Sequence, residues 1–222
     1  RGRPYPRRGR ARRPAATSGD STVGQNANYA EKATAFSATS NLLGLNPEGN
    51  SEIYRVAGSA DTLGLITQTG LGEHGEASQG VRSRLAFTSN GDITGLNTDG
   101  NREIFVWQEL DAPPFRQVGE SMGCLNAGPS IDNRGRFVAF QSTCNRIASL
   151  GNPDQSIFVW DDVKRKLLPL VVRGELNAAS ARPQSTKGMT MLTYESNLDS
   201  IVDPAICFLN VRDFLRTLAT QP

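Results

Sequence analysis

The sequence predicts an all-β fold built from a repeated unit of four short strands. Gly and Pro together make up 34 of the 222 residues, 22 and 12 respectively, a share typical of short strands joined by tight turns. The apolar segments are four to seven residues long and rich in Val, Ile and aromatic residues, and no helical period persists. An internal repeat with a period near 50 residues organises the body of the chain.

Two short motifs at a constant separation mark the repeat. The first motif is an Ala-Phe pair, replaced by Thr-Tyr in the last copy, at intervals of 51, 53 and 54 residues: Ala35-Phe36, Ala86-Phe87, Ala139-Phe140 and Thr193-Tyr194. Seventeen residues after each of the first three aromatics comes an Ile-aromatic pair: Ile53-Tyr54, Ile104-Phe105 and Ile157-Phe158. In the fourth copy the second motif is Cys207-Phe208, thirteen residues after Tyr194, as if four loop residues were deleted.

Each unit is expected to hold four strands, named a to d in chain order. In the third unit these strands lie near 129–132, 136–140, 156–160 and 166–172. In the second unit, residues 84–87, 103–107 and 115–118 take the b, c and d places. Because a four-stranded unit repeated every 40 to 50 residues or so is typical of a β-propeller blade, the sequence predicts a propeller over 21–222. Its approximate blades are 24–72, 76–120, 127–174 and 181–220.

The sequence does not determine whether the blades close into a ring. Four blades are the lower limit for a closed propeller. The chain is expected to form a closed four-bladed ring, half of an eight-bladed ring completed by a second chain, or a fragment of a longer chain. An open arc would expose apolar flanks on its first and last blades, which favours association or further residues.

The repeats resemble those of TolB-like propellers, bacterial WD-like blades that place an apolar strand ending in Phe-x-Ser before an Ile-Tyr-Val-x-Asp strand. The segments that carry the resemblance are GRFVAFQSTCN followed by SIFVWDD, and SRLAFTSNGD followed by NREIFVWQ. The family's Ser-Pro-Asp-Gly turn survives only as 131–135, and the fourth unit is degenerate. The resemblance covers about 190 residues and implies a fold; it says little about function, because this architecture hosts many functions.

The net charge of +2 conceals a division between a basic tail and an acidic body. Removing the seven tail arginines leaves 17 bases against 22 acids, so the body carries −5. The tail, residues 1–20, lacks the apolar surface to fold alone and is expected to be extended. We expect it to bind a polyanion or an acidic partner. The seven arginines are Arg1, Arg3, Arg7, Arg8, Arg10, Arg12 and Arg13.

The loops between strands b and c of the first two units carry oxygen-bearing side chains at alternate positions. These side chains are Asn46, Glu48, Asn50 and Glu52 in the first loop, and Asn97, Asp99, Asn101 and Glu103 in the second. Calcium takes six to eight oxygen ligands, so these loops are candidate calcium sites. Asn and Asp with Gly are equally the residues of tight turns, and turn formation is the favoured interpretation because the twelve-residue EF-hand spacing is absent.

Three cysteines permit one intrachain disulfide. The blade assignment places Cys124 and Cys144 in loops on the same face, whereas Cys207 falls in a strand and is expected to be a small buried apolar residue. A Cys124–Cys144 bridge fits an extracytoplasmic protein, as the resemblance also implies. Two free thiols remain the alternative.

Catalytic motifs are absent from the sequence. The single histidine, His74, lies in a Gly-rich loop and is expected to be solvated. Glu73 with Glu76, or Asp161 with Asp162, could serve as acid and base, but the aspartates also follow strand c, where turn chemistry explains them. Trp107 and Trp160 occupy equivalent repeat positions, which predicts a packing role for both.

These observations favour a noncatalytic binding or assembly module outside the cytoplasm: periplasmic, cell-surface or secreted. One loop face would bind a protein or glycan partner, and the tail an acidic surface, including that of another copy. The alternatives are a hydrolase or lyase of glycans or peptides with loop-face carboxylates and calcium, and nucleic-acid association through the tail, which rests on charge alone. No segment reaches the roughly 18 apolar residues of a membrane span, so none is expected.

Overall fold

The computed structural model describes residues 33–58, 60–80, 83–118, 122–144, 156–170, 180–185, 191–196, 205–211 and 213. The Arg-rich tail lies outside these residues, and so do most of the third b–c loop and the expected strand a of the first unit. In the described part of the chain no helix is long and apolar enough to cross a membrane.

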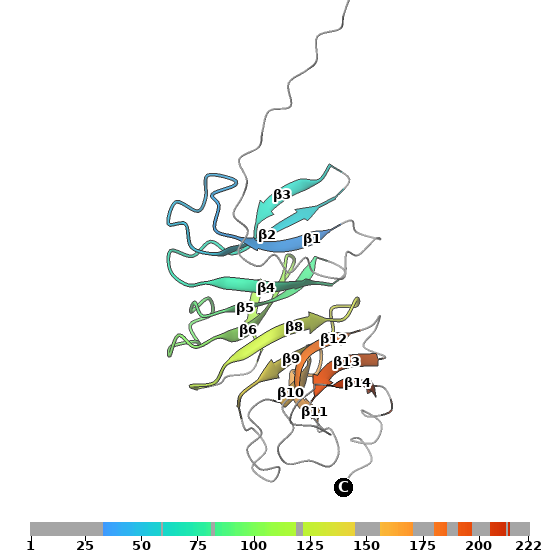
Figure 1. The fold of residues 1–222 in the computed structure, drawn as a ribbon. Coiled ribbons are helices and arrows are strands. Elements are labelled where there is room, and N and C mark those ends of the chain that lie inside the picture. Colours follow the sequence, from blue (N-terminus) through green and yellow to red (C-terminus); the bar gives the residue numbers. More distant parts are fainter. Residues whose placement is uncertain are drawn as a thin grey trace, which may run out of the picture.

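In the described residues, fourteen strands form four antiparallel sheets that follow one another along the chain (Figure 1). The first sheet is β1 (Thr34–Ala38), β2 (Glu52–Ala57) and β3 (Thr62–Leu65). The second is β4 (His74–Gln79), β5 (Arg84–Ser89), β6 (Glu103–Gln108) and β7 (Phe115–Gln117). The third is β8 (Asn126–Ile131), β9 (Phe137–Ser142), β10 (Ser156–Asp161) and β11 (Lys166–Leu170). The fourth is β12 (Ser180–Ser185), β13 (Met191–Ser196) and β14 (Ala205–Asn210).

The repeat motifs fix the strand register in the first three sheets. Each Ala-Phe aromatic lies directly opposite the aromatic of its Ile pair: Phe36 opposite Tyr54, Phe87 opposite Phe105 and Phe140 opposite Phe158. The opposed rings stack with centroids 5.8, 5.8 and 6.0 Å apart, respectively. Because successive residues of a strand point to opposite faces, this register puts the aromatics on one face of each sheet and the neighbouring Ala and Ile residues on the other.

The fourth sheet departs from the predicted register. Tyr194 lies opposite Cys207, and Phe208 lies opposite Thr193. The prediction that Phe208 takes the place of the earlier aromatics was therefore wrong by one residue.

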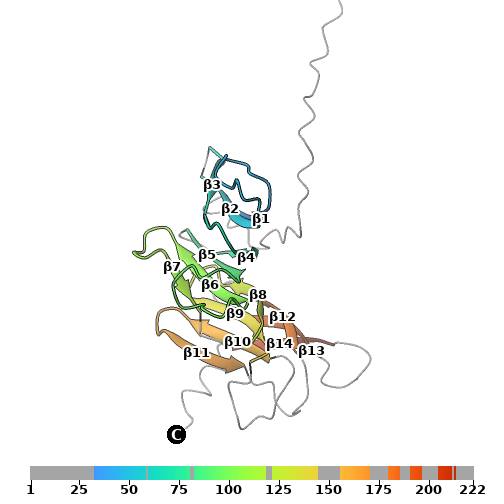
Figure 2. The same cartoon turned by 90° about the vertical axis from the view of Figure 1, so that its left-hand side faces the viewer.

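The sheets follow one another in chain order (Figures 1 and 2). The aromatic face of one sheet packs on the face of the preceding sheet that carries the Ala and Ile residues of the motifs. Phe87 and Phe105 lie in one cluster with Ala35 and Ile53 of the first sheet. Phe140 and Phe158 are clustered with residues of the second sheet, including Ile104. The clusters supply the burial that short, isolated sheets lack.

Trp107 and Trp160 have the packing roles expected of them. Trp107 is buried in the cluster between the first two sheets, and Trp160 packs against the cluster between the second and third.

The sheets have two ends that differ in their connections. The b–c loops and the d–a connections lie at one end, which we name the loop face; its described parts are 39–51, 66–73, 90–102, 122–125 and 143–144. The shorter links, such as β2 to β3, β6 to β7, β8 to β9 and β10 to β11, lie at the other end, which we name the turn face. In Figure 1 the first sheet lies at the top, and the fourth lies beside the third in the lower part of the view.

Candidate functional site

The first b–c loop is held in shape by the amide side chains of Asn46 and Asn50. Buried Asn46 donates from Nδ2 to the carbonyl oxygen of Asn50 at 2.8 Å and accepts from Gly49 N at 3.2 Å. Asn50 reaches the next connection, donating to the carbonyl oxygens of Thr69 and Gly72 at 3.1 and 2.9 Å. The amides therefore fasten the b–c loop to the following d–a connection.

The second b–c loop repeats this arrangement. Asn97 Nδ2 donates to the carbonyl oxygen of Asn101 at 2.9 Å, and Asn101 Nδ2 donates to the carbonyl oxygen of Cys124 at 3.0 Å. Asp99 accepts from Gly123 N at 2.9 Å, which adds a bond between the same two loops. A repeated network of this kind presents the loop face as a preorganised surface.

Glu52 and His74 meet behind these loops, at the junction between the first two sheets. Glu52 Oε1 accepts from Thr69 N at 3.0 Å and from Thr69 Oγ1 at 3.3 Å, and Thr69 Oγ1 lies 2.7 Å from His74 Nε2. With the imidazole proton on Nε2, His74 donates to the Thr69 hydroxyl, which in turn donates to the Glu52 carboxylate. The arrangement is a hydrogen-bonded junction closed to solvent.

The expectation that His74 is a solvated loop residue was wrong. It begins β4 and is 1% exposed, and its ring meets Phe87 edge-on at 6.2 Å. Burial lowers the pKa of His74, and the charges of Glu52 and Glu73 only partly oppose this effect. The repeat was the signal that could have placed it, because Asn126 begins β8 in the same way and donates to Glu103 Oε2 at 2.9 Å.

The structure assigns hydrogen bonds to most of the predicted calcium ligands. Five of them form hydrogen bonds with backbone groups of the loops: Asn46, Asn50, Asn97, Asn101 and Glu52. Glu103 is buried and accepts a hydrogen bond from Asn126. Glu48 is exposed. Among the described residues, no group of three or more His, Cys, Asp or Glu side chains is placed to hold a metal ion. These bonds explain the residue pattern by loop construction, and calcium binding stays a prediction.

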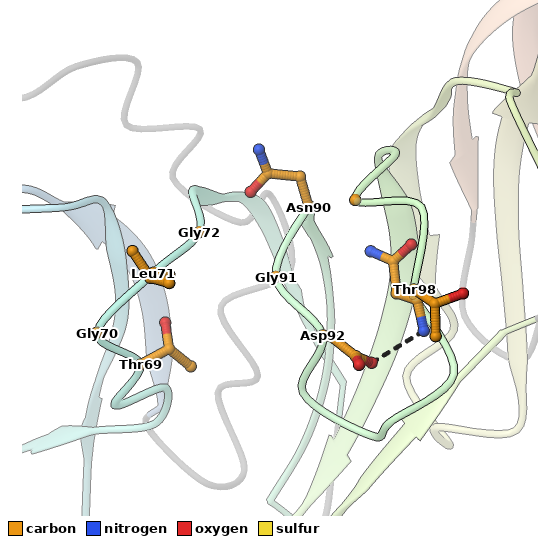
Figure 3. A pocket seen from close by; sticks show the side chains of 10 residues that line it. Thr69, Gly70, Leu71, Gly72, Asn90, Gly91, Asp92 and Thr98 are labelled. Carbon is orange, nitrogen blue, oxygen red and sulfur yellow. Dashed lines mark hydrogen bonds between the residues drawn. The ribbon is translucent and has the colours of Figure 1, made fainter.

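A cavity of about 690 Å³ opens on the loop face between the first d–a connection and the second b–c loop (Figure 3). The two loops approach closely at Gly72, where an added Cβ would lie 2.8 Å from the Cα of Gly91. Asp92 accepts from Asn97 N at 2.9 Å and so shapes the cavity wall. The lining residues are Thr69, Gly70, Leu71, Gly72, Asn90, Gly91, Asp92, Asn97, Thr98 and Gly100.

Apolar side chains are exposed on the same face as this cavity. Leu71, in its wall, is 86% exposed, and Leu45 and Leu96 are 46% and 55% exposed. Leu45 and Leu96 occupy equivalent repeat positions, since each lies eight residues before the Ile of its second motif. Of the large apolar side chains that are exposed in the described residues, seven lie on the loop face: Leu42, Leu43, Leu45, Leu71, Leu96, Met122 and Leu125.

A disulfide ties two parts of the loop face together. It joins Cys124 and Cys144, the two cysteines that the sequence assigned to one face, with Cα atoms 5.3 Å apart. Leu125 N donates to Thr143 Oγ1 at 2.9 Å beside it. Cys207 lies in β14, as the motif spacing predicts.

Asp161 and Asp162 are engaged in ion pairs near the turn face. Arg136 binds Asp161 through two nitrogens at 2.7 and 3.0 Å. Burial acts to raise the pKa of Asp161, but the Arg136 bonds and the backbone amides of the turn outweigh it and lower the pKa. Asp162 binds Arg84 and Arg116, which come from the second sheet, at 3.4 and 2.7 Å.

The remaining carboxylates considered for catalysis are also bonded to the protein. Glu73 accepts from Ser51 N at 3.0 Å, and Glu76 accepts from Gly128 N at 2.9 Å. Glu76 has φ of 48° at an irregularity in the β4–β5 ladder, and Gly128 stands at the equivalent place in the next unit with φ of 58°. Their bond therefore joins two repeated β-bulges across a sheet junction.

Comparison with known proteins shows similarity in structure. No protein-family model matches the chain, and no curated protein matches it. TolB from Acinetobacter baumannii is similar over 82% of this chain and 39% of its own, with 14% identity and a TM-score of 0.54. A puromycin-hydrolyzing peptidase from Mycobacterium tuberculosis matches 80% of this chain and 25% of its own, at 12% identity and a TM-score of 0.53.

A third similar structure is an oligogalacturonate lyase in complex with manganese. It matches 82% of this chain and 48% of its own, at 15% identity and a TM-score of 0.51. The chain thus spans less than half the length of each of these three proteins. Together with the successive antiparallel sheets, these similarities define the class of protein: a β-propeller fold of the kind seen in TolB. The fold is shared by a peptidase and a lyase, so activity has to be argued from the site.

Proposed function

We propose that this chain is a noncatalytic β-propeller module that binds a protein partner through its loop face. The observation that carries the proposal is the group of seven exposed apolar side chains there. Only three described large apolar side chains are exposed elsewhere: Leu110, Val163 and Met191. A gathering of exposed apolar side chains on one face is typical of protein interaction sites.

The noncatalytic part of the proposal rests on the state of the candidate acid and base groups. His74 is closed to solvent, and the candidate carboxylates bind arginines or backbone amides. A general base needs access to the proton that it removes, and of these groups only Glu73 is exposed. None of these groups is among the described residues that line the cavity, whose polar side chains are Thr, Asn and a single Asp.

An extracytoplasmic location belongs to the same proposal. The Cys124–Cys144 disulfide supports it, because such bonds form and persist in oxidising compartments. Its position across two loops of the proposed binding face would help to hold that face in one shape.

The test compares two sets of surface substitutions in a capture experiment with extracts of the source organism. Leu45→Ser, Leu71→Ser and Leu96→Ser together remove apolar surface from the loop face, while Leu110→Ser with Val163→Ser does so on the turn face. We expect a protein partner that is retained by the wild-type chain and by the turn-face variant and lost from the loop-face variant.

Two outcomes would contradict this function. Loss of the partner from the turn-face variant alone would move the site to the other face. Turnover by the purified chain on a panel of peptides and oligosaccharides would favour the hydrolase or lyase alternative, which the similar peptidase and lyase structures allow equally.

A further inference from the structure

The loop face and the turn face carry opposite net charge among the described residues. On the loop face the exposed ionic side chains of the described residues are Glu48, Glu73, Asp92, Asp99 and Arg102. On the turn face of the described residues the exposed cations are Arg134, Lys164, Arg165 and Lys166, against exposed Asp61, Glu109 and Asp213. Among the described residues, the loop face is therefore the more acidic of the two, even though the chain as a whole is positive.

The loop-face carboxylates keep their charge free for a ligand. In the described part of the chain, none of Glu48, Glu73, Asp92 and Asp99 lies within 4 Å of a cationic side-chain nitrogen as an ion pair. Asp92 and Asp99 accept hydrogen bonds from backbone amides, which fixes their positions without neutralising them. Fixed carboxylates next to exposed leucines suit a ligand that combines cations with apolar surface.

The chain itself contains such a ligand. Residues 1–13 hold seven arginines and no acid, together with Pro4, Tyr5 and Pro6. An arginine offers a weakly hydrated guanidinium and an apolar stem, so it can contact a carboxylate and a leucine together. We propose that the acidic loop face binds the Arg-rich segment 1–13 of this chain. This inference rests on the proposed function, since the segment would compete with the partner for the same face.

Binding is tested with a fluorescently labelled peptide of residues 1–14, titrated with full-length protein in which each of the seven tail arginines is replaced by Gln. This neutral-tail protein leaves the loop face open, and we expect saturable binding in fluorescence anisotropy. The wild-type protein should bind the same peptide several-fold more weakly, because its own tail occupies the face. Equal affinity for both proteins, or no binding to the neutral-tail protein, would overturn the inference.

The position of the binding site is tested by two matched charge variants of the neutral-tail protein. Glu48→Gln with Asp99→Asn removes two charges from the loop face, and Asp61→Asn with Glu109→Gln removes two from the turn face. We expect roughly fivefold weaker peptide binding for the first variant and no change for the second, in line with the modest strength of exposed ion pairs. The same loss in both variants would mean that only net charge matters and would contradict a loop-face site.

Salt provides an independent readout. Raising the ionic strength from about 0.01 M to about 1 M shortens the Debye length from about 30 Å to about 3 Å and should remove most of the peptide binding. Salt-independent binding would contradict the ionic contact. Failure of the peptide tests leaves the proposed function standing, because partner capture depends on the leucine substitutions and can be measured on the neutral-tail protein.

Discussion

At the scale of single residues, the start of strand a is where a polar side chain from one sheet meets a glutamate of the sheet before it. The first junction uses His74 with Glu52, and the second uses Asn126 with Glu103. Only the histidine of these two partners titrates near neutral pH. The first residue of strand a therefore makes the first junction sensitive to acid, where it is His74, and not the second, where it is Asn126.

His74 predicts an acid-sensitive stability. Its folded-state pKa lies below the ordinary value of 6.5, so the unfolded chain binds more protons in this range and stability falls as pH drops through and below 6.5. We expect His74→Asn, which copies the second junction, to show a smaller fall in melting temperature between about pH 7.5 and about pH 5. Equal falls in the two proteins would show that protonation of His74 does not control this transition.

Asp99 is the residue with which to test calcium. Asn at this position keeps an oxygen that can accept from Gly123 N and removes the charge that a bound cation would need. If these loops bind calcium, we expect millimolar calcium to raise the melting temperature of the unsubstituted protein, and Asp99→Asn to abolish this rise. The absence of any rise in the unsubstituted protein would remove the metal from these loops.

At the scale of the elements, buried ions connect the second and third sheets. Arg84 on β5 and Arg116 on β7 both bind Asp162, whose side chain is 3% exposed. Burial acts to lower the pKa of Arg116, but its bonds to Asp162 and Asp111 outweigh that effect and raise the pKa. The equivalent acid at the first junction, Glu109, is 55% exposed and lies 3.9 Å from Arg55.

The two junction acids are therefore expected to differ in their effect on stability. Asp162→Ala removes the buried carboxylate that two partly buried guanidinium groups share and should lower the free energy of unfolding by about 3 kcal/mol or more. Glu109→Ala breaks an exposed ion pair and should cost less than about 1 kcal/mol. Urea unfolding of both variants measures the difference, and similar costs would refute a structural role for burial at Asp162.

At the scale of the whole molecule, the order of the sheets leaves the aromatic face of the first sheet in a different position from the others. Phe87 is fully buried between two sheets, whereas Phe36, its repeat equivalent, is only partly buried. An aromatic side chain removed from a packed core typically costs 3 to 5 kcal/mol or so, and less where the site is open.

This difference gives a test of what covers the first sheet in solution. Phe87→Ala is expected to lower the free energy of unfolding by about 3 to 5 kcal/mol, and Phe36→Ala by about half as much or less. Urea unfolding at two protein concentrations measures both costs. Equal costs at the two positions would show that a further blade or a second chain packs on Phe36.

The local part of the fold was predictable from the sequence. The Ala-Phe and Ile-aromatic motifs predicted the strands and the opposed aromatics of three sheets, since strand alternation and motif spacing are local properties. The fourth register was missed because a shortened loop no longer fixes the pairing by the repeat spacing. The bulges at Glu76 and Gly128 leave no comparable pattern in the sequence.

The sequence by itself determined the repeated strands, the basic tail and the acidic body, all of which follow from composition and spacing. Only the tertiary structure decided that His74 is buried, that the loop asparagines fasten one blade to the next and that exposed leucines gather with free carboxylates on one face. Those properties depend on contacts between residues about 20 to 50 positions apart, for example Asn50 with Gly72 and Glu76 with Gly128. Such contacts exist only after the sheets have packed, because packing sets which loops become neighbours.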